Sequence, residues 1–289
     1  MKTGTYHDLF PFSPIVDRPQ LRWPDGAHVA VWVVPNIEHY ELEVDGRQMD
    51  VRNLSHRDYG NRVGIWRLMD ALTEFGIRGT VALNSAVCRH YPRVVERSLE
   101  LGWELMGHGL TNSQAHYDLD VADEAWMISA VVDEIRAIQG RPPRGWLGPA
   151  LSETPDTLNL LKQAGIEYTC DWVNDDQPYR MNNGLYSIPY TIELNDRPLF
   201  REPWATAWDY ERMIKASFDV LYREGASLAR VMCIALHPFI IGQPNKIDAL
   251  RGALAHITAY EHVWLATGSE IIDAFKAQEV RAGTASLVP

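Results

Sequence analysis

The chain has 289 residues, of which 46% are hydrophobic, so it is long enough to bury one large core as a single α/β domain. Its 38 acidic side chains against 27 basic ones give a formal net charge of −11, spread along the chain, which argues against nucleic acid as a partner. The opening residues lack the apolar segment of a secretory signal, and no apolar run reaches the roughly 18 residues of a membrane-spanning helix. We therefore expect a cytoplasmic protein without a membrane partner, with one domain over 1–289, an N-terminal arm at 1–21 and a loose tail at 279–289.

Apolar runs with strand character alternate with segments of helical period along most of the chain, which is typical of parallel strands joined by crossover helices. The predicted strands are His28–Pro35, Gly79–Leu83, Trp103–Met106, Gly145–Leu147, Tyr168–Cys170, Leu185–Ile188, Ala229–Leu236 and Val263–Ala266. The predicted helices include Val63–Phe75, Pro92–Leu101, Ala122–Ile138, Thr157–Ala164 and Asp209–Tyr222. About eight such strand–helix units predict a β/α barrel.

Two polar stretches interrupt this alternation. Glu41–Tyr59 lies between the first strand and its helix, and Asn174–Asn183 follows the fifth strand. Loops of this length inside a compact domain are more often functional than accidental, so we interpret both as loops or lids over a site.

Three side chains at the ends of predicted strands are the candidate catalytic residues. Glu38 follows the first strand, His108 the third and His237 the seventh, and strand ends of a barrel meet at one face. Such a trio can hold Zn²⁺ and leave one position open for water. Without metal, the same groups can move protons for a water molecule that attacks an amide-like carbonyl. The spacing of the residues leaves both chemistries open.

Other side chains near the strand ends are candidates for contacts with a substrate. Indole rings there can line a pocket for a planar ligand, although core filling is their more common role, and Trp204 is a further tryptophan of this kind. The candidates for substrate contacts are Asn36, Trp146, Pro149, Trp172 and Asp175. By composition alone, Asp175 and Asp176 would form a solvated turn.

Other hydrolytic and nucleotide chemistries find little support. The chain contains no G-x-S-x-G elbow, no glycine-rich phosphate loop and no H-E-x-x-H motif. A serine hydrolase and a nucleotide-dependent enzyme are therefore disfavoured.

Several short motifs follow one another along the chain: Arg22-Trp23-Pro24, Trp103 to Gly109, Arg144 to Pro149, Asp171-Trp172 with Asp175 to Pro178, and Leu236-His237-Pro238. Taken in this order, they resemble the polysaccharide deacetylase superfamily, also called carbohydrate esterase family four. The resemblance spans roughly Arg22 to Ala277 and implies a distorted (β/α)7 barrel. Within the superfamily the chain looks more like the allantoinase and cyclic-imide hydrolase branch, whose members open ureide or imide rings.

The chain departs from the motifs of sugar deacetylases at the positions that bind metal. Their first motif carries two Asp residues, where this chain has Asn36 and Glu38, and their H-x-x-x-H motif corresponds here to His108 and Asn112. If zinc is bound, the resemblance makes Glu38, His108 and Asn112 its ligands. Because an asparagine amide binds zinc poorly, the replacement should weaken the site. In the allantoinase branch catalysis is held not to require metal, whereas cyclic-imide hydrolases of the superfamily are described as zinc enzymes.

Our leading hypothesis is the hydrolysis of a small cyclic imide, ureide or amide by water. Glu38 would act as base or weak ligand, His108 as ligand or acid, and His237 as the acid that protonates the leaving nitrogen. The alternatives are a metal-dependent deacetylase of amino sugars or chitooligosaccharides and a non-catalytic barrel that binds a small ligand. The resemblance also implies a homo-oligomer, with a tetramer favoured.

Overall fold

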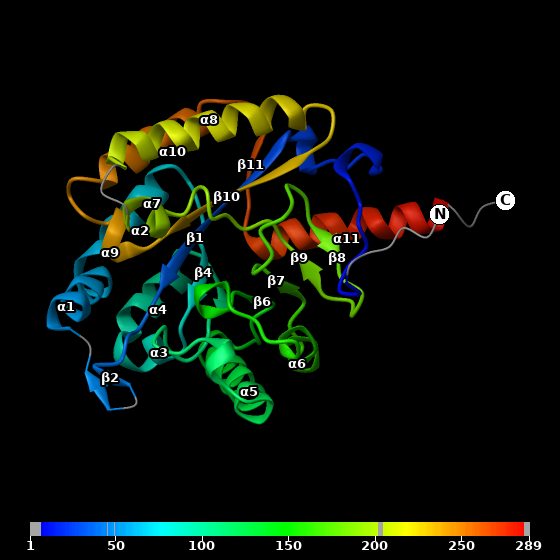
Figure 1. Cartoon of the computed structure of the whole chain (residues 1–289). Coiled ribbons are helices and arrows are strands. Elements are labelled where there is room, and N and C mark those ends of the chain that lie inside the picture. The colour runs from blue at the N-terminus through cyan, green and yellow to red at the C-terminus, as the bar shows by residue number, and fades with distance from the viewer. Residues whose placement is uncertain (1–6, 45, 49, 202–204, 286–289) are drawn as a thin grey trace.

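A nine-stranded sheet forms the centre of the computed structural model, which describes residues 7–44, 46–48, 50–201 and 205–285 (Figure 1). Its strands follow the order β10-β1-β4-β5-β6-β7-β9-β8, and β11 pairs with β1 beside this path. The bounds are β1 Val29–Ile37, β4 Thr80–Leu83, β5 Glu104–Gly107, β6 Gly145–Trp146, β7 Tyr168–Thr169, β8 Tyr179–Arg180, β9 Tyr186–Ser187, β10 Arg230–Leu236 and β11 Val263–Leu265. All pairings in the sheet are parallel except that of β8 with β9. All eight predicted strands are thereby confirmed.

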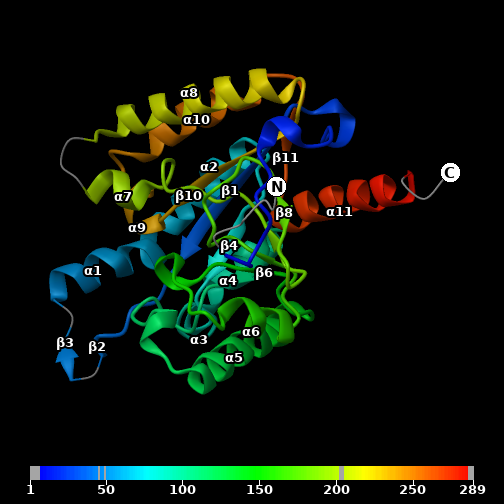
Figure 2. The same ribbon diagram turned by 45° about the vertical axis from the view of Figure 1, so that its right-hand side comes forward.

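Helices cover the outer face of this sheet, and the long pair α8 and α10 lies on the opposite side of the molecule from α5 and α6 (Figures 1 and 2). The helices are α1 Val51–Tyr59, α2 Ile65–Glu74, α3 Ala86–His90, α4 Pro92–Glu100, α5 Val121–Gln139, α6 Thr157–Gln163, α7 Asp196–Arg201, α8 Ala207–Gly225, α9 Pro238–Ile241, α10 Ile247–Thr258 and α11 Gly268–Ala285. No helix of the described residues is long and apolar enough to cross a membrane.

The alternation of side chains along β1 divides the core into an inner and an outer part. Ala30, Trp32 and Val34 belong to the cluster inside the curled sheet, while Val31 and Val33 belong to the cluster between the sheet and the helices. Successive residues of a strand point to opposite faces, and both faces are buried here, which explains the continuous apolar sequence of the strand.

The sheet curls into a half barrel, and among the described residues isolated backbone contacts join its two sides. The amide of Val231 on β10 donates to the carbonyl of Asp176 at 2.8 Å, and the amide of Ala235 donates to the carbonyl of Leu194 at 3.3 Å. This architecture, a mixed α/β fold with a curled half-barrel sheet, confirms the predicted distorted barrel. The parallel strand ends meet at one face, as that prediction requires.

A glycine allows α9, which directly follows His237, to pack closely against the segment before α2. A Cβ atom on Gly64 would lie 2.0 Å from the carbonyl oxygen of Pro238, a distance that no side chain could occupy. Gly64 ends a π-helical segment, Gly60–Gly64, between α1 and α2. The close approach fixes the backbone just after His237.

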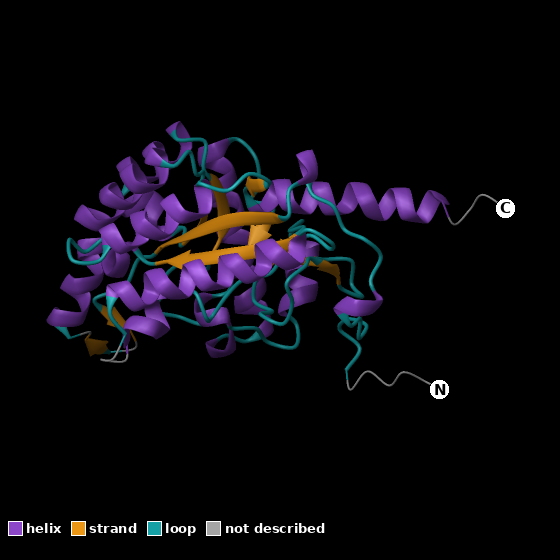
Figure 3. Cartoon of the chain, turned by 90° about the horizontal axis from the view of Figure 1, so that it is seen from above, coloured by secondary structure: helices purple, strands orange, loops and turns teal. Residues whose placement is uncertain are grey.

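Two predictions about segments between elements need correction. Glu41–Tyr59 is not an irregular loop, because it contains the antiparallel pair β2 (Glu43–Val44) and β3 (Arg47–Gln48) and then the helix α1. Of the tail predicted to be loose, 279–289, the part as far as Ala285 belongs to α11, which projects from the body of the molecule (Figure 3), and 286–289 lie outside the described residues. The stretch Asn174–Asn183 is a loop with the short strand β8 inside it.

Candidate functional site

Glu38, His108 and His237 converge as the sequence predicts, each just beyond the end of its strand. The Nε2 atom of His237 lies 3.5 Å from Oε1 of Glu38, and Nε2 of His108 lies 3.8 Å from the same oxygen. Only 6% of Glu38, 2% of His108 and 3% of His237 is exposed to solvent. The two imidazoles therefore face one carboxylate in a largely dry site.

Both oxygens of the Glu38 carboxylate accept hydrogen bonds from neighbouring side chains. The Nδ2 group of Asn112 donates to Oε1 at 2.7 Å, and the hydroxyl of Tyr40 donates to Oε2 at 2.7 Å. Asn112 Nδ2 also donates to the Tyr40 hydroxyl oxygen at 2.7 Å, so the three side chains form a closed set. The Glu38 backbone carbonyl accepts from Asn61 at 2.8 Å. The orientation of the carboxylate is thus held from several sides.

These contacts keep Glu38 ionised. Burial by itself would raise the pKa of the carboxyl, but the charges of His237 and Arg197 help to outweigh burial and hold its pKa well below the usual range. A carboxylate with so low a pKa is a weak base. Glu38 is therefore suited to orienting a water molecule and stabilising positive charge rather than to holding a proton.

His237 is paired with a buried carboxylate on its other side. Its Nδ1 atom lies 2.7 Å from Oδ1 of Asp196, the first residue of α7. Burial lowers the pKa of His237, but the charges of Glu38 and Asp196 and their hydrogen bonds raise it more, to about 9. The ring is therefore protonated at neutral pH and presents an N–H at Nε2.

His108 presents the opposite character at Nε2. Its Nδ1 atom lies 2.6 Å from the carbonyl oxygen of Leu147, and a carbonyl can only accept, so Nδ1 carries the proton. When the ring is neutral, this tautomer leaves a lone pair at Nε2, on the side of Glu38. The backbone carbonyl of His108 accepts from Asn84, which also accepts from the amide of His39 at 2.9 Å. The geometry is compatible with His108 as base or ligand.

The side chains around Glu38 do not fit a resident zinc ion. Glu38 Oε1 and His108 Nε2 could serve as two ligands, but Asn112 turns a donor, Nδ2, toward Glu38. The Oδ1 atom of Asn112 is buried and has no hydrogen-bond partner among the described residues, and a single amide oxygen is a poor third ligand for zinc. Within the described residues no group of three His, Cys, Asp or Glu side chains is placed to hold a metal.

The residues predicted to contact a substrate lie in different places. Asn36 is buried beneath the site, where its Nδ2 donates to the Tyr190 hydroxyl oxygen at 3.2 Å. Pro149 packs beside Gly109, the residue after His108. Trp146 packs on Gly107 of β5, and its indole N–H donates to His116 at 3.2 Å. Because Trp146 is fully buried in the core, we correct its predicted role to that of a core residue.

Trp172 and Asp175 bind parts of the chain other than the trio. The indole N–H of Trp172 donates to the carboxylate of Glu153 at 3.2 Å, and its ring packs edge-on against Phe10. Asp175 forms a two-point ion pair with Arg18 of the N-terminal arm, at 2.7 and 2.5 Å. The carboxylate of Asp175 thus anchors the arm, and its predicted contact with a substrate stays a prediction.

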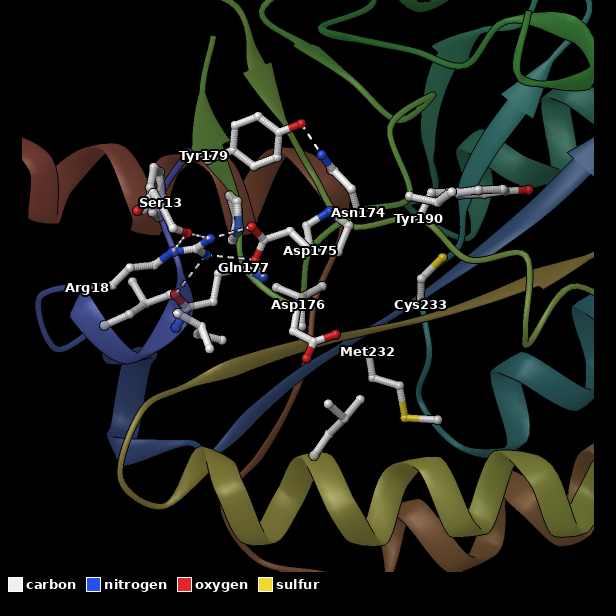
Figure 4. A pocket seen from close by; sticks show the side chains of 18 of the residues that line it. Ser13, Arg18, Asn174, Asp175, Asp176, Gln177, Tyr179, Tyr190, Met232 and Cys233 are labelled. Carbon is white, nitrogen blue, oxygen red and sulfur yellow. Dashed lines mark hydrogen bonds and ion pairs between the residues drawn. The ribbon is translucent and has the colours of Figure 1, made fainter. Parts of the chain in front are cut away.

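This ion pair borders a cavity of about 1450 Å³ at the seam of the half barrel (Figure 4). The cavity is lined by the N-terminal arm, by residues 173–180 and 189–194, and by parts of α8, β10 and α11. Tyr190 and Cys233 line its inner wall, whereas none of the trio lines it. Asp176 lies at this cavity rather than at the trio, and Trp204 lies outside the described residues.

Four residues of the site were not predicted from the sequence. Tyr40 had a usable signal, because residues two apart in an extended segment share a face and Glu38 is two positions earlier. Asp196 is 41 positions from His237 in the sequence, and no local spacing links the two. Arg57 and Arg197 lie near Tyr40 from two separate helices, α1 and α7. Only the fold brings these residues together.

Comparison with known proteins finds relatives that are similar over nearly the whole chain. The profile of the family described as Polysaccharide deacetylase matches residues 57–169, which include His108 and Asn112. A Schizosaccharomyces pombe protein named "Putative polysaccharide deacetylase" is 28% identical over 301 residues, covering 89% of this chain and 92% of the relative.

Solved structures give the same result for the fold. The crystal structure of Puue allantoinase has a TM-score of 0.83 at 26% identity and covers 93% of this chain and 98% of that one. A "probable Polysaccharide deacetylase" from Pseudomonas aeruginosa PAO1 has a TM-score of 0.81 at 25% identity, covering 90% and 94%. The predicted family resemblance is confirmed at this level.

Proposed function

We propose that this chain is a hydrolase that opens a C–N bond in a small cyclic imide, ureide or related amide. It matches the polysaccharide deacetylase family in fold and over residues 57–169. The observation that carries the proposal is the pair of imidazoles around Glu38: His237 offers a proton at Nε2 and His108 offers a lone pair. Hydrolysis of an amide by water needs a base that takes a proton from the water and an acid that protonates the leaving nitrogen, and the two imidazoles can fill these roles. The likeness to Puue allantoinase favours a small ring over a polymer.

The reaction begins with a water molecule that hydrogen bonds to Nε2 of His108 and Oε1 of Glu38, which lie 3.8 Å apart. As the water oxygen attacks the substrate carbonyl carbon, His108 takes a proton from it, and the Glu38 carboxylate stabilises the resulting imidazolium. His237 then donates its Nε2 proton to the ring nitrogen as the C–N bond breaks. The products are a carboxylic acid and a free amide or amine nitrogen in one open chain.

The test is a ring-opening assay on succinimide, maleimide, hydantoin, dihydrouracil and allantoin, before and after dialysis against a chelator. We expect turnover of at least one ring and no loss of it after dialysis, because the donor set does not fit a resident zinc. His108→Ala should abolish turnover with an unchanged circular dichroism spectrum. Full activity of this variant would overturn the assignment of His108.

A second candidate, a metal-dependent N-deacetylase of amino sugars or chitooligosaccharides, is favoured by the names of the relatives. Acetate release from N-acetylglucosamine oligomers, lost with a chelator and restored by zinc, would support this candidate. Acetate release without any ring opening would replace our proposal.

A further inference from the structure

Two arginines lie beside the candidate site without a carboxylate partner among the described residues. Arg57 is on α1 and Arg197 is on α7, and both helices pack against α9, which directly follows His237 (Figures 1 and 2). No ion pair within 4.0 Å is formed by either guanidinium in the described part of the chain. Most of the other arginines on this acidic protein are paired with Asp or Glu.

Arg57 is held in place by aromatic rings rather than by an anion. Its guanidinium carbon lies 3.8 Å from the centre of the Tyr40 ring and 5.5 Å from the centre of the Phe239 ring. Both rings flank the trio, since Tyr40 donates to Glu38 and the Phe239 ring lies 5.6 Å from that of His237. Stacking of this kind leaves the N–H groups of a guanidinium free to bind another group in its plane.

One of these groups is unsatisfied in the part of the chain that the structure describes. The Nη1 atom of Arg57 is buried and makes no hydrogen bond to any described residue. A buried donor without a partner is rare in proteins and costs stability, so it calls for a further partner such as a water molecule, an ion or a ligand. The aromatic rings thus hold a charged donor beside the reacting groups.

The acidic groups nearby are already engaged. Asp196 binds His237, and the two oxygens of Glu38 accept from Asn112 and Tyr40. Arg197 stands next to Asp196 in the chain, and its charge is among those that lower the pKa of Glu38. Lys246 adds a further positive charge, with its Nζ atom 4.8 Å from the centre of the Phe200 ring on α7. Three cationic side chains, Arg57, Arg197 and Lys246, therefore lie near the candidate site of a chain whose net charge is −11.

We propose that the substrate ring carries a carboxylate and that Arg57 and Arg197 bind this group beside the reacting carbonyl. The inference rests on the proposed function and narrows it to anionic cyclic imides or ureides. A planar guanidinium suits a carboxylate because it can donate two parallel hydrogen bonds, which also orients the ring. Hydrolysis then converts a substrate with one carboxylate into a product with two.

Matched pairs of charged and neutral rings test this specificity. Dihydroorotate is compared with dihydrouracil, and hydantoin-5-acetate with 5-ethylhydantoin, by kcat/KM at constant ionic strength. We expect the wild-type protein to prefer the charged ring of each pair by about tenfold to a hundredfold, the range of a charge-assisted hydrogen bond. Arg57→Gln and Arg197→Gln should remove most of this preference, mainly through KM.

A control variant and a charge-preserving variant separate recognition from folding. Arg141→Gln removes an exposed guanidinium far along the chain in the loop after α5, and it should leave the preference unchanged. Arg57→Lys should retain part of the preference, since it keeps the charge but loses the planar donor. Equal kcat/KM values for the charged and the neutral ring of each pair in the wild-type protein would overturn the inference. So would an equal loss of kcat/KM on both rings in the arginine variants.

Binding of the ring-opened product keeps the inference testable if no ring is hydrolysed. Both charged rings open to N-carbamoylaspartate, whose binding is measured by calorimetry. Binding by the wild-type protein that is weakened about tenfold or more in Arg57→Gln would support the carboxylate site even if the proposed function failed. Unchanged binding in both arginine variants, or no binding by the wild-type protein, would overturn it.

Discussion

The pairing of Asp196 with His237 fixes which ring nitrogen of His237 can donate a proton in the site. Asp196 accepts at 2.7 Å from Nδ1 of His237 and also binds the backbone amide of His237 at 2.9 Å. The ring is thereby fixed so that Nε2 points to Glu38. A buried carboxylate that orients an imidazole and stabilises its charged form is a common part of acid–base catalysis.

Asp196→Asn should therefore lower the rate and move the upper pH limit of activity to a lower pH. The raised pKa of His237, about 9, means that the acid keeps its proton up to about that pH and that activity falls as the pH rises through it. Without the charge of Asp196 the alkaline limb of the pH–rate profile should move to lower pH, and kcat should fall by about 10² or more. An alkaline limb that stays in place in this variant would contradict the role of Asp196.

Asn112 occupies the position at which a third metal ligand would be needed. Asn112→His restores the H-x-x-x-H spacing with His108, so the variant should bind zinc more tightly than the wild-type protein by about tenfold or more. Equilibrium dialysis followed by metal analysis measures this gain. Asn112→Ala is the matched control, since it removes the bond to Glu38 without adding a ligand, and it should gain no zinc.

Stoichiometric zinc in the purified wild-type protein would contradict this account. It would mean that Glu38 and His108 hold the metal with the Asn112 amide turned over, so that Oδ1 is directed at the ion. The same result would give weight to the deacetylase candidate.

At the scale of elements, the contact of α9 with the segment before α2 positions the end of β10. Gly64→Ala should destabilise the fold by about 1–3 kcal/mol, because its Cβ would lie 2.0 Å from the carbonyl oxygen of Pro238 and backbone must move. The shift acts on the residue after His237, so kcat should fall as well. Denaturant unfolding and the ring-opening assay measure the two effects.

Gly252→Ala is the control for this substitution. The three atoms nearest to a Cβ atom there all belong to the carboxylate end of Glu211, the closest at 2.5 Å, and that flexible group can move aside. Alanine also favours the helix over glycine. We expect its free energy of unfolding to lie within about 1 kcal/mol of that of the wild-type protein. An equal loss of stability in both variants would show that the close contact with α9 matters no more than the contact of another helical glycine.

The elements that the sequence predicts well are those whose side chains are buried in a regular pattern. β1 and β10 are buried along their whole length, and their apolar runs are unmistakable. By contrast, none of the residues of α1 is buried, so Val51–Tyr59 shows no apolar stripe and was interpreted as part of a loop. Arg57 could not be predicted either, because its proposed role depends on aromatic rings that lie on other segments.

The candidate trio could be predicted because parallel strands bring their ends to one face, whatever the distances along the chain. Asp196 could not, because it reaches His237 from a helix that follows an irregular segment. Strand-end position does not reveal that Trp146 points into the core or that Asp175 pairs with the N-terminal arm. Topology was predictable, whereas side-chain partners were not.

At the scale of the whole molecule, an ion cluster ties the last helix to the sheet. Glu167, just before β7, accepts from Nε of Arg144 at 2.7 Å and from Lys276 on α11 at 2.9 Å. Arg144 also binds Asp273 of α11 at 2.6 Å. The hydrogen bond and charge of Arg144, helped by those of Lys276, outweigh burial and lower the pKa of Glu167 to about 2. The cluster joins segments that are more than a hundred residues apart, as Glu167 and Lys276 are separated by 109 positions.

The lowered pKa of Glu167 predicts a pH-dependent contribution to stability. A carboxyl whose pKa is lower in the folded state stabilises the fold above its unfolded value of 4.5, and the contribution is lost as the pH falls from there toward about 2. Because about a third of the side chain is exposed, solvent screening limits the effect to about 1 kcal/mol or less at neutral pH. Glu167→Gln should therefore be less stable than the wild-type protein at pH 7 by that amount, with the gap closing below pH ~4. Asp248→Asn, which breaks an ion pair whose carboxylate is 75% exposed, is the control and should change stability little at any pH. A gap between Glu167→Gln and wild type that stays constant from pH 7 to pH 3 in urea unfolding would mean that packing of the side chain, rather than its charge, holds α11 to the sheet.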